Sequence, residues 1–314
     1  MTLSKKVEGL INEQLTHWET ARNNYNHLEN VIVKSVVMPN DTEFYVQFNP
    51  QRIISSSAKV DKASIEKRAC FLCKENRPKE QNGIDYNNFS ILINPYPIFK
   101  KHLTIVGNEH TPQQIKGNFK SMLDLAKNLD EFLIFYNGPK CGASAPDHFH
   151  FQAIEKNILP IEKQFSKIEK KYHFKNGDNN ISTLENIYRK TILLSSNNED
   201  ELCFWFDKVY ENLKNIIPSE PEPMMNILAK WESEKWQIFI FPRENHRPKQ
   251  YFSEGEEQIL FSPASVDFGG FLITPRQEDF NKMYAKLIED IFNQVSLSEE
   301  KWGKIEVFFI ENEL

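Results

Sequence analysis

The sequence of 314 residues predicts an α+β protein made of two related halves. Runs in which apolar residues alternate or continue indicate strands, and segments with helical spacing lie between them. In addition, a pattern of strand, turn and strand followed by Glu, His and Pro occurs twice, first in "FSILINPYPIFKKHLTIVGNEHTPQ" and then in "MMNILAKWESEKWQIFIFPRENHRPKQ". A chain of this length can bury a sizeable core.

The first half begins with an amphipathic helix, because apolar residues recur at helical spacing over about 3–30. The run "EFYVQFNPQRI" (43–53) alternates like a strand, and a polar connection then leads to "CFLC". Thr111 and Pro112 suit the N-terminus of a helix that extends to about residue 129. Further strands of this half are expected at 89–95, 102–107, 131–138 and 148–154.

The remainder divides into a connection and a second half. The segment 156–222 is more charged, has a mostly helical pattern and ends in the hinge-like "PSEPEP". After the second copy of the repeated pattern, two strands are expected around Gly269–Gly270, and a helix over 278–296. The sequence therefore predicts an N-terminal half over 1–155 and a C-terminal half over 223–314.

Composition narrows the class of partner. The net charge of −6 and the pI near 5.8 argue against a broad nucleic-acid-binding surface. No apolar run approaches the ~18 residues of a transmembrane helix, and the N-terminus is too polar for a signal peptide. Four cysteines do not form a disulfide framework, so a reducing, cytoplasmic compartment is expected. These features favour a small-molecule partner over nucleic acid or a membrane.

The stretch "CGASAPDHFHFQAI" contains the most informative pattern. On a strand, His148, His150 and Gln152 would share one face, with Phe149 and Phe151 on the other. A neutral imidazole can attack phosphorus and hold it as a phosphoramidate. A surface strand with two incidental histidines is the alternative interpretation.

A phosphoryl nucleophile needs donors around it. We expect His150 to be the nucleophile and the amide of Gln152 to donate to an oxygen next to the attacked phosphorus. The preceding loop, "NGPKCGAS", supplies Gly142 and Ser144, whose backbone N–H groups and hydroxyl are suited to cradle phosphate.

These residues carry a resemblance. "NGPKCGASAPDHFHFQ" resembles the active-site segment of the galactose-1-phosphate uridylyltransferase branch of the histidine triad superfamily, which also contains diadenosine tetraphosphate phosphorylases and GDP-L-galactose phosphorylases. The segment "FSPASVDFGGFLITPRQEDF" resembles the C-terminal part of those phosphorylases. The resemblance implies two histidine-triad-like halves, each an antiparallel sheet with packed helices. Asp147, inserted before the first His, departs from the uridylyltransferase pattern. The matching site positions are Asn137, Gly142, Ser144, His148, His150 and Gln152.

The pair Cys70 and Cys73 in "CFLC" is specific for metal only when further ligands exist. His102, His110 and His148 are the available partners. The resemblance to bacterial uridylyltransferases implies that both cysteines, His110 and His148 bind a structural zinc ion. A buried pair of small apolar cysteines is the alternative, and no helix clearly follows the pair to favour a redox role.

Other residues are implied to contact the substrate. The turn with Asn94, the strand residue His102 and the loop residue Arg52 fall where relatives place groups near the nucleotide. A core histidine and a solvated arginine are the alternatives for the last two. The guanidinium of Arg52 is suited to bind phosphate.

The second half contributes a basic loop. "FPRENHRPKQ" places Arg243, His246, Arg247 and Lys249 after an apolar strand. In the related phosphorylases, basic residues of this half reach the acceptor or leaving phosphate, and Arg243, Arg247 and Lys249 are the expected counterparts. A charged surface turn is the alternative.

The sequence as a whole favours a nucleotidyltransferase or phosphorylase with a double-displacement mechanism. His150 would attack the α-phosphorus of a nucleoside diphospho-sugar or dinucleoside polyphosphate, and phosphate or a sugar phosphate would collect the nucleotidyl group. No redox cofactor is needed, and magnesium is optional because positioned cations can replace it. A hydrolase, an adenylyltransferase acting with sulfate or phosphate, and a non-catalytic nucleotide-binding protein are the alternatives. The base and the oligomeric state, a homodimer included, stay open.

Overall fold

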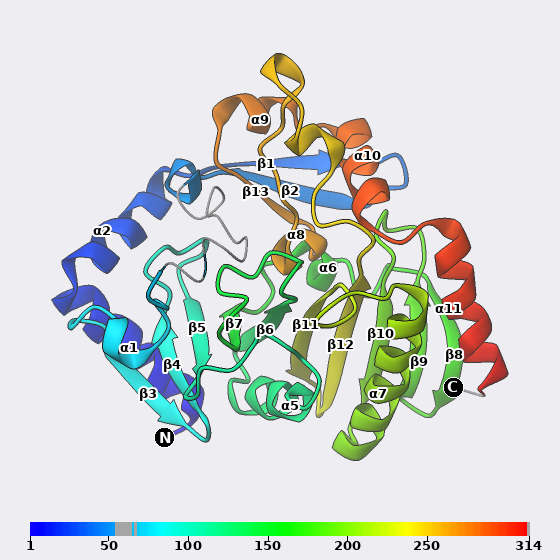
Figure 1. Cartoon of the computed structure of the whole chain (residues 1–314), viewed down its shortest axis with the longest axis horizontal. Coiled ribbons are helices and arrows are strands. Elements are labelled where there is room, and N and C mark those ends of the chain that lie inside the picture. Colours follow the sequence, from blue (N-terminus) through cyan, green and yellow to red (C-terminus); the bar gives the residue numbers. More distant parts are fainter. Residues whose placement is uncertain (54–64, 66–67, 313–314) are drawn as a thin grey trace.

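A ten-stranded sheet runs across the part of the chain that the computed structural model describes, residues 1–53, 65 and 68–312 (Figure 1). Its strand order is β3-β4-β5-β7-β6-β11-β12-β10-β9-β8, and all neighbouring strands are antiparallel. The α+β fold with a large antiparallel sheet is thereby confirmed. The strands are β3 (Gly83–Tyr86), β4 (Phe89–Ile93), β5 (His102–Gly107), β6 (Phe132–Asn137), β7 (His150–Glu155), β8 (Lys170–Asn176), β9 (Asn179–Leu184), β10 (Ile192–Ser196), β11 (Met225–Glu232) and β12 (Lys235–Pro242).

The two predicted halves contribute to one continuous sheet. β6 of the first half pairs with β11 of the second, with Asn137 opposite Asn226 and Tyr136 opposite Ile227. The expectation of a mostly helical connection over 156–222 is wrong, because β8, β9 and β10 lie in this segment beside one long helix, α7 (Glu199–Ile216). The segment therefore completes the sheet.

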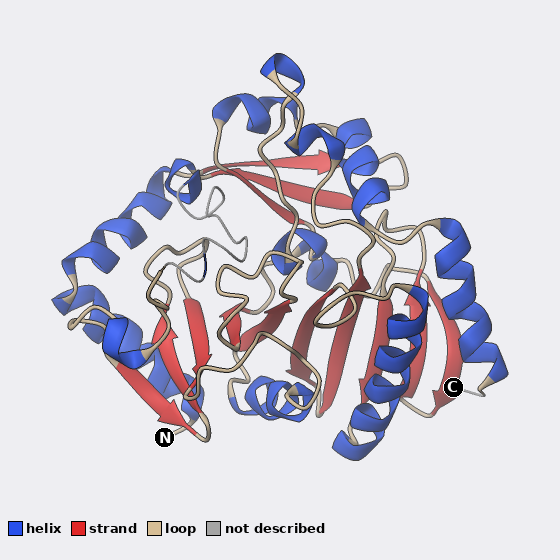
Figure 2. Cartoon of the chain, in the orientation of Figure 1, coloured by secondary structure: helices blue, strands red, loops and turns tan. Residues whose placement is uncertain are grey.

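Helices cover one face of this sheet, and a smaller sheet covers part of the other (Figure 2). The alternation of strand side chains divides the core: Ile134 and Tyr136 belong to the buried cluster that also contains residues of α1, α5, α7 and α11, whereas Leu133 and Phe135 belong to the cluster that contains residues of the smaller sheet. The helices are α1 (Leu3–His17), α2 (Glu19–Asn26), α5 (Phe119–Asn128), α6 (Pro160–Lys163), α7 (Glu199–Ile216), α8 (Ser265–Phe268), α9 (Gln277–Lys282), α10 (Ala285–Val295) and α11 (Glu299–Glu311).

The smaller sheet brings the C-terminal part of the chain over the first half. It contains β1 (Ile32–Val37), β2 (Glu43–Phe48) and β13 (Phe271–Thr274). β1 and β2 are antiparallel, whereas β13 runs parallel to β2. This pairing holds residues just before β13 opposite β4 to β7, so that the space between the two sheets becomes the candidate site.

Several expected element boundaries are corrected. The opening helix is divided at Trp18, the expected helix over 278–296 is divided into α9 and α10, and the first expected strand near Gly269–Gly270 is instead α8. The helix expected from Thr111 begins only at α5, because Thr111 and Gln113 form main-chain hydrogen bonds with the segment before β7. The polar connection expected before "CFLC" lies largely outside the described residues. Among the described helices, none has the length and apolarity to cross a membrane.

Candidate active site

A cavity of about 680 Å³ lies between the large sheet and the segment that leads into β13. Residues of β4, β5, β6 and β7 form one wall, and Ala264, Val266, Asp267 and Ile273 contribute to the other. The structure brings nine of the predicted site residues into this lining: Arg52, Asn94, His102, Asn137, Gly142, Ser144, His150, Gln152 and Arg247.

His150 is held as a neutral imidazole at the start of β7. Its Nδ1 lies 2.8 Å from the carbonyl oxygen of His148, and because a carbonyl only accepts, Nδ1 carries the proton and Nε2 keeps its lone pair. Burial lowers the pKa of His150 to about 4. At neutral pH this side chain is therefore an uncharged base with its Nε2 lone pair available.

The main chain of His150 is fixed by a residue that the sequence analysis did not identify. The buried amide of Gln113 accepts from His150 N at 2.8 Å and donates to His150 O at 2.9 Å. It also donates to the carbonyl oxygen of Asn137 at 3.0 Å. Gln113 thus ties the start of β7 to the end of β6. The sequence analysis did not identify this role of Gln113 because Gln113, Asn137 and His150 lie far apart in the sequence.

The amide of Gln152 has a defined orientation. The main-chain N–H of Ile98 donates to His102 Nδ1 at 3.3 Å, so His102 carries its proton on Nε2 and donates to Gln152 Oε1 at 2.9 Å. Asn94 Nδ2 approaches the same oxygen at 3.5 Å. The Gln152 oxygen is therefore occupied, which leaves its NH₂ group as the donor for a ligand. Burial, with a smaller effect of Arg52, lowers the pKa of His102 to about 3.

Strand alternation places His150 and Gln152 on the cavity face, as expected, with Phe149 and Phe151 in the opposite core layer. The expectation that His148 shares this strand face is wrong, because His148 lies before the start of β7. Its side chain points instead to Cys70 and Cys73.

The loop before β7 approaches the C-terminal segment closely. Gly142 has a φ of +99°, and a Cβ at this position would lie 2.8 Å from Ala264 Cβ, so the loop requires glycine here. Asn137 Oδ1 accepts from the main-chain N of Ser265 at 2.9 Å and from its hydroxyl at 2.7 Å. The carbonyl oxygen of Ser144 accepts from Arg68 Nη2 at 3.0 Å.

Among the described residues, three arginines line the cavity. Arg52 donates to the carbonyl oxygen of Tyr96 at 3.2 Å, and Arg247 stacks 4.0 Å above the ring centre of Tyr251. Arg68 was not identified from the sequence, although it stands two residues before "CFLC". Their charges make the cavity suited to a phosphorylated ligand.

Asp267 and His246 also line the cavity and were not assigned a role from the sequence. The carboxylate of Asp267 accepts from the main-chain N of Ala264 at 2.8 Å and of Ile273 at 3.0 Å. Burial raises the pKa of Asp267 to about 7.

Two predicted substrate-binding residues are absent from this lining. Arg243 is fully buried beside the cavity, and its guanidinium donates to Asn226 Oδ1 at 2.6 Å and to the carbonyl oxygen of Pro263 at 2.9 Å. Lys249 belongs to the following turn. Neither residue lines the cavity in this structure: Arg243 holds the wall, and Lys249 lies outside the lining.

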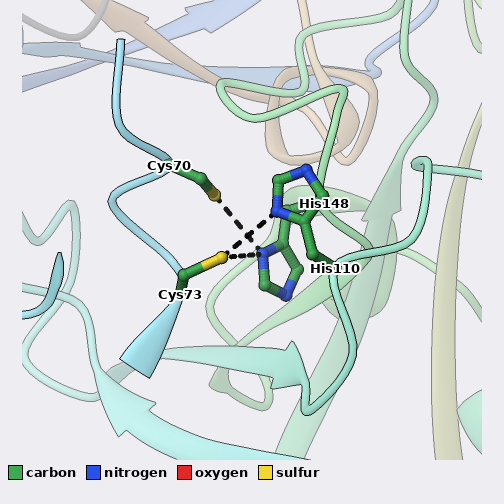
Figure 3. Close-up of side chains that lie close together, drawn as sticks. All are labelled: Cys70, Cys73, His110 and His148. Carbon is green, nitrogen blue, oxygen red and sulfur yellow. Dashed lines mark hydrogen bonds between the residues drawn. The ribbon is translucent and has the colours of Figure 1, made fainter. Parts of the chain in front are cut away.

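The four predicted metal-binding side chains gather beside the cavity (Figure 3). Cys70 Sγ lies 3.3 Å from His148 Nδ1, and Cys73 Sγ lies 3.2 Å from His110 Nδ1 and 3.5 Å from His148 Nδ1. All four donor atoms lie within 4.8 Å of one another. Tetrahedral zinc with its usual bonds would separate sulfur from nitrogen by about 3.5 Å, so the donor set could hold zinc.

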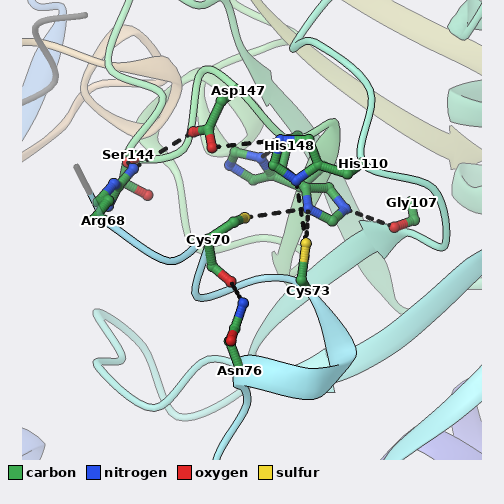
Figure 4. A network of polar contacts seen from close by, with 10 residues as sticks. Arg68, Cys70, Cys73, Asn76, Gly107, His110, Ser144, Asp147 and His148 are labelled. Atoms are coloured by element: carbon green, nitrogen blue, oxygen red, sulfur yellow. Dashed lines mark hydrogen bonds and ion pairs between the residues drawn. The ribbon is translucent and has the colours of Figure 1, made fainter. Parts of the chain in front are cut away.

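The surroundings of this cluster suit a metal and connect it to the cavity (Figure 4). His148 Nε2 donates to the carbonyl oxygen of Gly107 at 2.8 Å, which leaves Nδ1 as the ligand atom. Asp147 lies 3.7 Å from His110 Nε2 and 3.6 Å from Arg68 Nη2. Arg68 in turn binds the Ser144 carbonyl, so Asp147 and Arg68 link the cysteine-histidine cluster to the loop of the cavity.

Two family models match successive parts of the chain. Residues 10–155 match a family model described as a domain of unknown function (DUF4922), and residues 162–312 match one described as "GDPGP1-like, C-terminal domain". A galactose-1-phosphate uridylyltransferase of Clostridium acetobutylicum is 23% identical over 224 residues, which is 62% of this chain. The match spans 44% of that protein.

Solved structures of yeast Ap4A phosphorylase Apa2 share the fold. One is superposable with a TM-score of 0.56 at 16% identity and covers 89% of this chain and 94% of the phosphorylase. Its complex with AMP superposes with a TM-score of 0.59 at 16% identity and covers 91% of this chain and 97% of the phosphorylase. The complex with Ap4A superposes with a TM-score of 0.54 at 15% identity and covers 89% of this chain and 96% of the phosphorylase.

Fold, H-x-H-x-Q segment and relatives together define a protein of the histidine triad class. Within that superfamily, residues 162–312 match the GDPGP1-like model, and the chain is similar in sequence to a galactose-1-phosphate uridylyltransferase and in fold to an Ap4A phosphorylase.

Proposed function

We propose that the protein is a nucleotidyltransferase, acting as a phosphorylase or sugar-phosphate transferase, that passes through a covalent nucleotidyl-His150 intermediate. The donor is a nucleoside diphospho-sugar or a dinucleoside polyphosphate. The observation that carries the proposal is the hydrogen bond from His150 Nδ1 to the His148 carbonyl, which leaves Nε2 unprotonated in the lining of the cavity. The AMP and Ap4A complexes of the structurally similar yeast phosphorylase support a nucleotide as ligand.

In the first step, Nε2 of His150 donates its lone pair to the α-phosphorus of the donor. The new N–P bond replaces the bond from phosphorus to the bridging oxygen, which leaves with the sugar phosphate or the remaining polyphosphate. No proton has to be removed from the nucleophile. The positive charge that develops on the imidazole is stabilised by the His148 carbonyl oxygen at Nδ1.

Donors around the cavity stabilise the transferring phosphoryl group. The NH₂ group of Gln152 is turned away from His102 and is available to a non-bridging oxygen. The loop at Gly142 and Ser144 supplies further N–H and hydroxyl donors, and Arg52 and Arg68 balance the phosphate charge.

In the second step, an oxygen of inorganic phosphate or of a sugar phosphate attacks the same phosphorus, and the N–P bond breaks. Neutral His150 is regenerated, and the nucleotidyl group leaves as a nucleoside diphosphate or nucleoside diphospho-sugar. We assign Arg247 to the acceptor phosphate, because it is the cation that the C-terminal half contributes to the cavity lining within the described chain.

Zinc fits the Cys70, Cys73, His110 and His148 cluster and is proposed as a structural ion. It would fix the position of His148, whose carbonyl oxygen orients the nucleophile. The ion would therefore support the geometry of the site rather than take part in the transfer.

The test is product analysis. The purified protein is incubated with GDP-sugars, UDP-sugars or diadenosine tetraphosphate, with and without phosphate, and the products are separated by anion exchange. We expect a nucleoside diphosphate whose formation requires phosphate and disappears in His150→Ala, but not in the matched His17→Ala, which changes an exposed histidine of α1. Release of nucleoside monophosphate at a rate independent of phosphate would instead show a hydrolase, and turnover of no donor would leave a binding protein.

A further inference from the structure

Asp147 lies between the cysteine-histidine cluster and the cavity, and it has no part in the transfer steps proposed above. It stands directly before His148 in "APDHFH". Its side chain is 22% exposed, and its two oxygens have different neighbours: Oδ2 lies 3.7 Å from His110 Nε2, and Oδ1 lies 3.6 Å from Arg68 Nη2 (Figure 4). One carboxylate therefore contacts both a predicted metal ligand and a cation of the cavity lining.

The oxygen that faces His110 suits the surroundings of a metal site. His110 Nδ1 lies 3.2 Å from Cys73 Sγ, so Nδ1 is the ring atom directed at the cluster, and Nε2 faces Asp147. A histidine that binds a metal usually donates its other ring N–H to a carboxylate or a carbonyl oxygen, which orients the ring. Asp147 has that position beside His110, as the Gly107 carbonyl oxygen has beside His148.

The oxygen that faces Arg68 is connected to the loop of the cavity. Arg68 Nη2 donates to the carbonyl oxygen of Ser144 at 3.0 Å, and the guanidinium carbon lies 4.9 Å from the ring centre of Phe71. Arg68, Ser144 and Phe71 all belong to the lining. Asp147 Oδ1 and Arg68 Nε are shielded from solvent, and neither atom has a hydrogen-bond partner among the described residues. If the carboxylate and the guanidinium came about 0.7 Å closer than 3.6 Å, they would form a charge-assisted hydrogen bond.

We propose that Asp147 is a positioning residue that couples metal binding at the cysteine-histidine cluster to binding of the nucleotide donor. With a metal on His110 Nδ1, the imidazole ring is fixed and its Nε2–H is a stronger donor to the Asp147 carboxylate. The carboxylate in turn holds Arg68, and Arg68 holds the Ser144 carbonyl in the loop that we assign to the transferring phosphoryl group. The inference rests on the proposed function for the identity of the ligand. Because coupling between two sites is reciprocal, the nucleotide also tightens the binding of the metal.

The competing explanation is that Asp147 only stabilises the loop before β7. Asp147→Asn keeps the size of the side chain and removes its charge, so the two explanations predict different results. A positioning residue gives weaker nucleotide binding and loses the coupling, whereas a residue that only stabilises the loop gives a lower melting temperature with an unchanged nucleotide affinity. The matched control is Asp207→Asn, which alters an exposed carboxylate of α7.

The first measurement is the affinity of the full, zinc-loaded chain for ADP, GDP and UDP by calorimetric titration, and the nucleotide that wild type binds most tightly is used for each variant. We expect Asp147→Asn to bind it about tenfold more weakly, Asp207→Asn to bind it like wild type, and Asp147→Glu, which keeps the charge, to recover part of the loss. Because Asp147 acts through Arg68, Asp147→Asn combined with Arg68→Gln should bind no more weakly than Arg68→Gln alone. Additive losses in the double variant, or an affinity of Asp147→Asn equal to that of wild type, overturn the proposal.

The second measurement keeps the inference testable in wild type even if a variant does not fold. The protein is equilibrated with a chromogenic zinc chelator, with and without the nucleotide, and the zinc retained by the protein is measured. We expect the nucleotide to raise the zinc affinity of wild type and of Asp207→Asn about tenfold and that of Asp147→Asn not at all. Zinc retention in wild type that is independent of a bound nucleotide overturns the coupling.

The inference and the proposed function fail separately. Coupling without formation of nucleotidyl-His150 supports the role of Asp147 and refutes the transfer chemistry. Formation of nucleotidyl-His150 without coupling refutes the role of Asp147 and supports the transfer chemistry. If none of the three nucleotides binds to wild type, both are overturned.

Discussion

The stability of the candidate site depends on Gln113, and replacing it with leucine tests this directly. The side chain makes three buried hydrogen bonds, one from His150 N, one to His150 O and one to Asn137 O. Leucine has a similar size but leaves three main-chain groups without partners, at about 1–3 kcal/mol each. The more favourable burial of leucine offsets about 1–2 kcal/mol. We therefore expect Gln113→Leu to lower the free energy of unfolding by about 3 kcal/mol.

Urea unfolding followed by circular dichroism measures this change, and an unchanged dependence on urea would show that the folded state is intact. The matched control is Gln114→Leu, which alters the neighbouring, half-buried glutamine. A loss below about 1 kcal/mol relative to that control would contradict the role assigned to the Gln113 bridge. Because Gln113 also fixes the main chain of His150, we expect the variant to form less nucleotidyl-enzyme even where it is folded.

Three further predictions concern the metal, the buried histidine and the loop. We expect the purified protein to contain one zinc ion per chain. Cys73→Ser should remove this ion and lower the melting temperature, whereas Cys203→Ser should do neither. Equal zinc content in the two variants would exclude the cluster as the zinc site. Burial lowers the pKa of His102 to about 3, so this side chain takes up a proton near pH 6.5 in the unfolded chain but not in the folded protein. The free energy of unfolding therefore decreases by about 1.4 kcal/mol for each pH unit below about 6.5. Unfolding measured at pH 7 and pH 5 should therefore show His102→Gln losing about 2 kcal/mol less than wild type, and equal losses would refute the shift. Gly142→Ala should cost more stability than Gly117→Ala and should also reduce turnover. Both positions have positive φ, but of these two only Gly142 would place the added Cβ against another residue. Equal losses of stability in the two variants would contradict the close approach.

The segment that carries His150 and Gln152 could be predicted because it lies on a central strand, β7. The alternation around β7 placed His150 and Gln152 on one face, and the spacing of "CFLC" indicated a metal cluster whose four side chains the structure brings together. Central strands have one or both faces buried, so their apolar pattern is strong.

Two of the missed strands, β1 and β8, lie at sheet edges. β1 and β8 expose most of their residues and contain several lysines and polar side chains, as edge strands commonly do, so their apolar pattern is weak. β8 is one reason why the segment 156–222 was predicted to be mostly helical.

The second wall of the cavity could not be predicted from local pattern. Asp267, His246 and Arg68 reach the cavity through contacts between segments far apart in the chain. The same holds for Arg243: its basic loop was recognised, but its burial follows from hydrogen bonds to Asn226 and Pro263 that no local pattern indicates.

The most direct test of the central claim is the intact mass of the protein after brief incubation with each donor, without an acceptor. A nucleotidyl-His150 intermediate predicts a gain of one nucleoside monophosphate in wild type and in His17→Ala, none in His150→Ala, and loss of the added mass as nucleoside diphosphate when phosphate is supplied. The donor that labels the protein would also identify the base. Turnover without any mass gain, or an adduct that persists in His150→Ala, would contradict the account.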